Sequence, residues 1–327
     1  MLGRGFWIAA GAALAAALSP ATASATFSIV ACDARGVCGA AAATNNLAVG
    51  ASVIHARARV GALASQFETN PAYGPRGLAR LEAGQAPKAV LDELLRTDGD
   101  FDGQDLSYRQ VGLVGAKGAG VAYTGVEAQA SSWAGALSGE TFSVQGNGLA
   151  GPRVLEAMRQ AYDQSGGPLA ERLMVALEAG EAAGGQTIGG LSAAILVRTP
   201  EGGWQDIDLR VDAADRPVAE LRRLLNLRFA NDAVIRAERL SRQGKSEQAR
   251  AALVEALRLG PGWDRIQRRA ARLYLGLGDH EAAVAALARF AAINPAWARI
   301  EVGDPLYTPL ADDPAVKRIR AASIPSR

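Results

Sequence analysis

The sequence predicts an α+β fold followed by an all-helical region. Up to about residue 212, short apolar runs separated by turn residues alternate with segments whose leucines recur at helical spacing. Beyond residue 213 the strand pattern ends and helical spacing continues. The order of strands, helices, strands, helices and strands suits stacked antiparallel sheets covered by helices. A chain of 327 residues is long enough to form two hydrophobic cores.

The first 25 residues have the order of a secretory signal peptide. Arg4 precedes an apolar run at positions 6–18, and a small-residue cleavage site ends at Ala25. We expect cleavage after Ala25 and a periplasmic or secreted protein. No second apolar run is long enough to span a bilayer, so we expect no integral membrane segment in the mature chain.

Thr26 would become the first residue after this cleavage. Its hydroxyl would then lie beside a free α-amine, whose reference pKa of about 7.7–8.0 lets it act as a general base near neutral pH. An adjacent base is a known means of activating a weak hydroxyl nucleophile. Thr26 is therefore the candidate catalytic residue. The alternative is that Thr26 is only a β-forming residue that opens a strand.

The expected elements of residues 26–212 follow from local pattern. The first group contains strands at 26–31 and 39–43, two more strands before residue 66, and helices at 75–83 and 87–96. The second group contains strands at 108–114, 118–123 and 141–145, followed by helices at 152–164 and 169–182. Strands at 191–198 and 204–211 end the region. The glycines between Gly112 and Gly120 precede a β-like segment. A dinucleotide fingerprint requires a helix there, so we expect no nucleotide cofactor.

Cys32 and Cys38 are the only cysteines, and they flank a predicted hairpin turn. They could form a disulfide outside the cytoplasm or remain as two buried thiols, and the sequence leaves both open. His55 and His280 have no second ligand at metal-binding spacing, so we expect no metal site. The net charge of +2 and the lack of a nucleic-acid motif argue against a nucleic-acid partner.

The C-terminal region contains an internal repeat. The pairs Gly244 and Gly278, and Pro261 and Pro295, are each separated by 34 residues, which is the tetratricopeptide (TPR) period. We expect a signal peptide at 1–25, a sheet domain at 26–212, a linker helix at 213–230 that ends near Phe229, two TPR-like repeats at 231–297 and a capping segment at 298–327. The repeats would offer a docking face to a protein or peptide partner, or would only stabilise the C-terminus. Their arginines would make one side basic, or would only form a solvated helix face.

Several motifs in the first region occur together in a fixed order. They are Thr26-Phe27-Ser28-Ile29-Val30-Ala31, Leu47-Ala48-Val49-Gly50, Tyr73-Gly74-Pro75-Arg76-Gly77-Leu78, Arg109-Gln110-Val111-Gly112, Gln145-Gly146-Asn147 and Leu169-Ala170-Glu171-Arg172-Leu173. Over about residues 26–211 the chain resembles the bacterial family called domain of unknown function 1028. Its members resemble N-terminal nucleophile (Ntn) hydrolases. The resemblance implies a four-layer αββα sandwich with the nucleophile at the start of the first strand.

Two functions are compatible with these features. The first is an exported amidohydrolase of unknown amide or peptide substrate, with Thr26 as nucleophile and Gln66, Asn70 and Asn147 as substrate-binding or oxyanion candidates. The second is a non-catalytic periplasmic binding or scaffold protein on a degenerate Ntn-like fold. The second is favoured by two departures from the family pattern. Thr44-Asn45 stands where a Ser-Lys pair is usual, and a charged cluster before Ser192 is replaced by Gln186, Ile188, Gly190 and Leu191.

Overall fold

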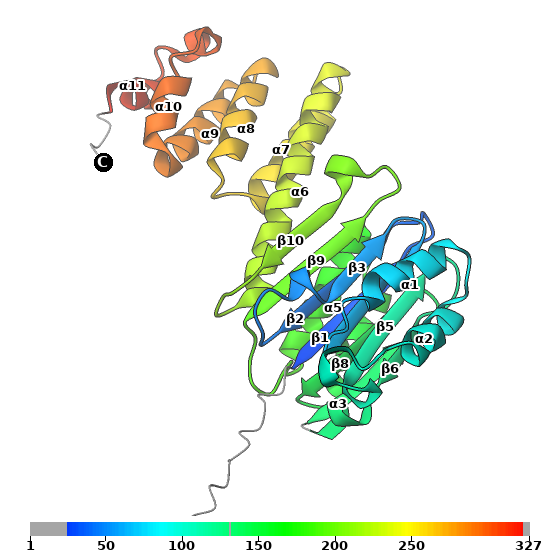
Figure 1. Ribbon diagram of the computed structural model, residues 1–327. Helices are drawn as coiled ribbons and strands as arrows, with labels where there is room; N and C mark the ends of the chain where they lie inside the picture. Colours follow the sequence, from blue (N-terminus) through cyan, green and yellow to red (C-terminus); the bar gives the residue numbers. More distant parts are fainter. Residues whose placement is uncertain (1–24, 131, 323–327) are drawn as a thin grey trace, which may run out of the picture.

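The computed structural model describes residues 25–130 and 132–322. Of the predicted signal peptide, only Ala25 falls within the described residues. The described chain is a mixed α+β structure in which two antiparallel sheets are followed by a helical C-terminal region (Figure 1). The alternation of strand and helix patterns in the sequence predicted this fold class.

The larger sheet is built from β1 (Thr26–Cys32), β2 (Cys38–Thr44), β7 (Trp133–Ser138), β8 (Phe142–Leu149), β9 (Ser192–Arg198) and β10 (Ile207–Val211). Its strand order is β10-β9-β2-β1-β8-β7, so β1 lies between β2 and β8 and is antiparallel to both. All seven residues of β1 and all seven of β2 are buried. These strands are almost entirely apolar or small because both of their faces are covered.

The smaller sheet is built from β3 (Ile54–Arg57), β4 (Gly61–Phe67), β5 (Arg109–Gly115) and β6 (Val121–Thr124), in that spatial order. It faces the larger sheet, with β4 packed on β1 and β5 packed on β8. Gly112 of β5 shows why small residues are needed between the sheets. A Cβ at Gly112 would lie 1.9 Å from Oε1 of Gln145 in β8.

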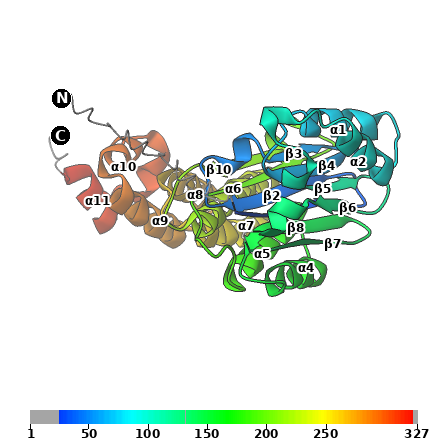
Figure 2. The ribbon, with the colours of Figure 1, turned by 60° about the horizontal axis from the view of Figure 1, so that its bottom comes forward.

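Helices cover the outer faces of the sheets. They are α1 (Tyr73–Glu82), α2 (Pro87–Arg96), α4 (Arg153–Gln164) and α5 (Leu169–Ala182), whereas the short α3 (Val126–Ala130) lies in the connection from β6 to β7. Figure 2 shows α1 and α2 on the side of the smaller sheet and α4 and α5 on the side of the larger one. In α2, Pro87 fits the first turn, where its missing N–H costs nothing, and Val90, Leu91 and Leu94 form the buried face.

The C-terminal region contains α6 (Pro217–Arg242), α7 (Ser246–Leu259), α8 (Asp264–Gly276), α9 (His280–Ile293), α10 (Pro295–Glu301) and α11 (Pro314–Ala321). α6 is shared between two cores: Leu221 and Leu225 pack into the core under the larger sheet, whereas Ala233 and Val234 pack into the helical core. One continuous helix therefore connects the two cores.

The helical region repeats its turn geometry as well as its sequence. Gly244 follows α6 with φ of 72°, and Gly278 follows α8 with φ of 74°. Both glycines adopt the left-handed conformation that commonly ends a helix. Ala249 and Ala283, five residues after each glycine, are both fully buried.

Short 3-10 helices lie in the connections: η1 (Val49–Ala51), η2 (Phe101–Gly103), η3 (Leu106–Tyr108), η4 (Gly203–Gln205) and η5 (Pro305–Leu310). Four elements differ from the sequence prediction. β8 continues to Leu149, because residues 146–148 pair as strand although their glycines indicated a turn. α3 and the half-buried edge strand β7 lie where no element was predicted. α6 ends at Arg242, well past the predicted end near Phe229.

Cys32 and Cys38 form a disulfide at the end of the β1–β2 hairpin. The register places the two residues directly opposite each other, which decides between the alternatives left open by the sequence. Structural disulfides are typical of oxidising compartments outside the cytoplasm. Among the described residues, no helix combines the length and apolar character needed to cross a membrane.

Candidate functional site

Thr26 lies at the first position of the central strand of the larger sheet. Its register partners are Thr44 at the end of β2 and Asn147 in β8, so polar side chains of both neighbouring strands meet at its level. Thr26 is 2% exposed. The threonine predicted from the cleavage site is therefore a buried residue in a polar environment.

Each polar group of Thr26 has a hydrogen-bond partner. Its backbone N–H donates to Oδ1 of Asn147 at 3.2 Å, and its hydroxyl donates to Oγ1 of Thr44 at 3.0 Å. Its carbonyl accepts from Nε2 of Gln66 at 3.3 Å. Two of the three predicted neighbours, Gln66 and Asn147, are thus in direct contact with Thr26, and the side chains that bind it are all neutral.

A buried polar network extends from these residues between the two sheets. Gln110 Oε1 accepts from Gln66 Nε2 and from Asn147 Nδ2, both at 2.8 Å. The Ser28 hydroxyl donates to Gln66 Oε1 at 2.6 Å and accepts from Gln145 Nε2 at 2.6 Å. Side chains of β1, β4, β5 and β8 therefore hold one another in fixed orientations. The sequence did not identify Gln110, Gln145 or Ser28 as members of this network.

Asn70, the third predicted neighbour, belongs to a different cluster. Its side-chain amide donates to the carboxylate of Asp98 at 3.1 Å. Arg109 donates to both oxygens of that carboxylate, at 3.0 and 3.2 Å, and the Tyr73 hydroxyl donates to it as well. Asn70 therefore ties the start of α1 to the loop after α2, and no hydrogen bond joins it to Thr26 among the described residues.

The Asp98 cluster is a buried ion pair. The side chains of Arg109 and Asp98 are 1% and 3% exposed. Burial alone would raise the pKa of Asp98, but hydrogen bonds from Arg109, Tyr73 and Asn70 outweigh it and hold the pKa below its usual value. Burial also raises the pKa of the Tyr73 hydroxyl, and the Asp98 charge beside it adds to that shift. The cluster is therefore ionised, its carboxylate is hydrogen bonded on both oxygens, and we assign it a role in supporting the fold.

A small cavity of about 50 Å³ lies beside Thr26. Thr44 and Phe67 contribute to its lining. Phe67 has φ of 66°, and nearby Ala48 has φ of 53°. Left-handed backbone is rare for residues other than glycine and costs free energy, and it concentrates at functional sites. The local sequence gave no signal of this strain, because neither residue type favours it.

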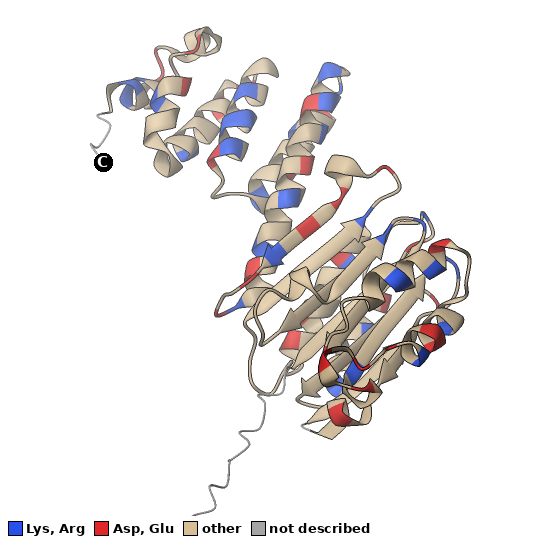
Figure 3. Ribbon diagram, in the orientation of Figure 1, with Lys and Arg blue, Asp and Glu red and all other residues tan. Residues whose placement is uncertain are grey.

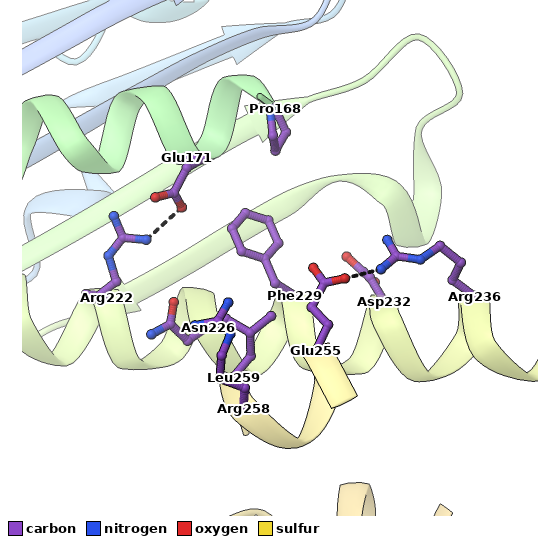
Figure 4. A pocket seen from close by; sticks show the side chains of 10 residues that line it. All are labelled: Pro168, Glu171, Arg222, Asn226, Phe229, Asp232, Arg236, Glu255, Arg258 and Leu259. Carbon is purple, nitrogen blue, oxygen red and sulfur yellow. Dashed lines mark hydrogen bonds and ion pairs between the residues drawn. The ribbon is translucent and has the colours of Figure 1, made fainter. Parts of the chain in front are cut away.

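A larger cavity of about 590 Å³ lies elsewhere, where α5 meets α6 and α7. Its lining residues are Pro168, Glu171, Arg222, Asn226, Phe229, Asp232, Arg236, Glu255, Arg258 and Leu259 (Figure 4). Most of its charges are paired within the lining: Arg222 binds Glu171 at 2.7 Å, and Arg236 binds Glu255. This cavity lies at the junction between the sheet core and the helical region.

Several arginines of the helical region pair with acidic residues of neighbouring helices. Figure 3 shows basic residues along α6 and α8 beside acidic ones. Arg269 of α8 binds Glu238 of α6 at 2.8 Å, and Arg268 binds Glu301 of α10 at 2.6 Å. Arg272 binds the same Glu301. These ion pairs hold neighbouring helices together and neutralise part of the predicted basic side.

No cluster of three or more potential metal ligands occurs within residues 25–130 and 132–322. His55 packs against Gly74, where a Cβ would lie 2.3 Å from the imidazole ring. Burial lowers the pKa of His55 and favours its neutral form. It is a packing residue in this structure.

The sequence profile of the family described as "Family of unknown function (DUF1028)" matches residues 26–221, which is more than half of the chain. The chain belongs to the DUF1028 family. The match begins at Thr26 and ends within α6, so the DUF1028 region contains both sheets and α7 to α11 lie beyond it.

A crystal structure of a DUF1028 protein from Silicibacter pomeroyi is similar to this chain. The two are 32% identical, with a TM-score of 0.54 over 62% of this chain and 88% of that chain. A search of curated proteins gave no significant match. Family membership therefore establishes the fold of the DUF1028 region and leaves its chemistry to be argued from the site.

Proposed function

We propose that this chain is an exported Ntn-type amidohydrolase in which Thr26, once it is the first residue, is the nucleophile. The observation that carries the proposal is the position of Thr26. It opens the central strand, directly after a predicted cleavage site, and each of its polar groups is hydrogen bonded. Two facing sheets with helices on both outer sides also fit the αββα sandwich of Ntn hydrolases.

The neutral surroundings of Thr26 are compatible with a basic amine. A buried ammonium group without a counter-charge is disfavoured, so burial favours the free amine. Oδ1 of Asn147 already accepts the Thr26 N–H and would orient the amine after cleavage. Gln66 holds the Thr26 carbonyl from the facing sheet. We assign Gln66 and Asn147 to positioning Thr26, since their amides are engaged in the network around it.

The reaction would proceed in two stages. Thr26 Oγ1 attacks the substrate amide carbon while its proton passes to the Thr26 amine. The C–N bond then breaks, the amine gives this proton to the leaving nitrogen, and an ester to Thr26 remains. Water attacks the ester carbon in the second stage, with the amine again taking a proton. As the ester C–O bond breaks, the amine gives this proton to Oγ1, which releases the acid and restores the Thr26 hydroxyl and the free amine.

A docking function for the helical region is a second proposal. α6 to α9 fit two TPR-like repeats, since the left-handed glycines 244 and 278 and the buried alanines 249 and 283 recur at 34 residues. TPR stacks bind peptides or partner helices on one face. Because three arginines of α8, Arg268, Arg269 and Arg272, are paired within the chain, they are not free to bind an acidic partner.

An electrophilic probe that acylates N-terminal threonine tests the hydrolase. Exported wild-type protein should be labelled at Thr26, Thr26→Ser should keep part of the labelling, and Thr26→Ala should lose it. Thr308→Ala, at an exposed threonine of the helical region, is the matched control and should label as wild type does. Loss of one buried hydroxyl should cost about 1 kcal/mol of stability, so each variant should remain folded.

Labelling that persists in Thr26→Ala would show that another residue reacts. If correctly processed wild type is not labelled, the non-catalytic binding protein becomes the better proposal. The neutral side chains around Thr26 are the observation that favours this alternative.

A further inference from the structure

Ala25, the residue before Thr26, is enclosed and fully hydrogen bonded. It is 2% exposed. Its N–H donates to Oδ1 of Asn45 at 2.9 Å. Its carbonyl accepts from the Thr44 hydroxyl at 2.7 Å, from the Asn45 N–H at 3.4 Å and from Nε2 of Gln186. Gly148 packs against the methyl group. We use the name alanine cradle for the site formed by Thr44, Asn45, Gln186 and Gly148.

Gly148 limits the size of the side chain that the cradle accepts. A Cβ on Gly148 would lie 2.4 Å from the Cβ of Ala25, so the Ala25 methyl packs directly on the Gly148 backbone. Gly148 also has φ of 62°, a conformation in which larger residues are strained. With Ala25 almost wholly buried, a longer side chain at this place would have to displace its neighbours.

The cradle is coupled to the nucleophile through one hydroxyl. Thr44 Oγ1 accepts from the Thr26 hydroxyl at 3.0 Å and donates to the Ala25 carbonyl at 2.7 Å. A carbonyl held by the cradle is therefore separated from the Thr26 hydroxyl by a single shared partner.

Cleavage after Ala25 would remove the residue that satisfies these groups. Thr44 is 2% exposed and Gln186 is 8% exposed, and Oε1 of Gln186 has no hydrogen-bond partner even with Ala25 present. A buried polar group without a partner costs about 1–3 kcal/mol. The cleaved chain would thus present several buried donors and acceptors that a matching ligand or water must satisfy.

We propose that the alanine cradle of the chain beginning at Thr26 binds the acyl residue of the substrate, and that this residue is L-alanine or one of similar size in amide linkage. This inference rests on the proposed hydrolase function and names its substrate class. The substrate carbonyl takes hydrogen bonds from Thr44, Gln186 and the Asn45 N–H. The N–H of the same residue donates to Asn45 Oδ1, and its small side chain packs on Gly148.

Binding to a chain without the nucleophile tests the cradle separately from catalysis. Thr26→Ala protein, shown by mass to begin at residue 26, is titrated with N-acetyl-L-alanine methylamide and followed by NMR. N-acetyl-L-leucine methylamide is the matched probe, with the same amides and a larger side chain. We expect the alanine probe to bind at least about tenfold more tightly, because overpacking a closed site costs about 1–3 kcal/mol.

Two variants give the controls. Gln186→Leu removes a donor to the carbonyl and should weaken binding of the alanine probe about five- to tenfold, as expected for the loss of one hydrogen bond. Gln85→Leu, at an exposed glutamine, should not change it. A chain that begins at Ala25 carries its own residue in the cradle and should not bind the probe.

Equal binding of the two probes, binding by the chain that begins at Ala25, or no binding to the processed Thr26→Ala chain would each overturn the inference. Failure of the hydrolase proposal would look different. In that case the alanine probe would bind selectively, while wild type would neither react with electrophiles nor cleave alanyl amides.

Discussion

Replacing Asp98 with alanine should strongly destabilise the DUF1028 region. The change removes a carboxylate that is 3% exposed and leaves Arg109, which is 1% exposed, without its counter-charge. Tyr73 and Asn70 lose an acceptor at the same time. Breaking a buried ion pair by removing one partner costs about 3–5 kcal/mol. A region of this size should then lose roughly 6–20 °C in melting temperature.

Asp92→Ala is the matched control. Asp92 pairs with Lys88 on the surface of α2, where the two side chains are 56% and 70% exposed. Such a pair contributes about 0.3–0.5 kcal/mol. Urea unfolding followed by circular dichroism should separate the two variants clearly. A loss below about 1 kcal/mol in Asp98→Ala would refute the assignment of this cluster as a main support of the fold.

The pH dependence gives an independent check of the same cluster. The folded-state pKa of Asp98 is below its usual value, so its contribution to stability is present above the unfolded pKa of about 3.9 and is lost as pH falls through the folded pKa. The stability difference between wild type and Asp98→Ala should therefore be constant near neutral pH and shrink below about pH 4. A difference that does not change down to pH 2 would contradict the ionised state.

Two further substitutions test the disulfide and the contact between the sheets. The double substitution Cys32→Ser and Cys38→Ser should lower the free energy of unfolding by about 2 kcal/mol, because the bridge closes a short loop with a sequence separation of 6. Unchanged urea unfolding under non-reducing conditions would contradict this. Gly112→Ala should lower the free energy of unfolding by about 1–3 kcal/mol and reduce labelling of Thr26, since its Cβ would force Gln145 away from Ser28. Gly166→Ala is the control, because a Cβ there has no neighbour within 4 Å. Equal stability of the two variants would contradict the close approach of the sheets at Gly112.

Local patterns predicted most elements of the fold. The helices at 87–96 and 169–182 have the predicted bounds, since a proline before or at the first turn and a leucine face define each of them. The predicted strand ended at residue 145, short of the end of β8, because Gly146 and Gly148 indicate a turn when read locally. In the structure they lie in a strand between close neighbours. The predicted helix ended near Phe229, well before the end of α6, because the buried residues of α6 change from leucine to alanine where it passes from one core to the other.

The site was only partly predictable for a related reason. Thr26 could be identified from the cleavage site, and Asn147 lies opposite it across a single strand pair. Gln110 and Gln145 join the network from facing sheets, and no local pattern specifies which strands will face each other. Asn70 carries the same amide chemistry as Asn147, but the buried charge of Asp98 engages it. Asn45 and Gln186 stood out only as neutral residues in place of charged ones, and the structure puts both against Ala25.

The intact mass of the protein purified from the exported fraction tests the central claim most directly. The amine of Thr26 can serve as the base only if the chain begins at that residue. We expect a single mass corresponding to residues 26–327 with the Cys32–Cys38 disulfide formed. A mass that retains Ala25 would leave the Thr26 nitrogen as an amide and the alanine cradle filled, and would contradict both the mechanism and the substrate class.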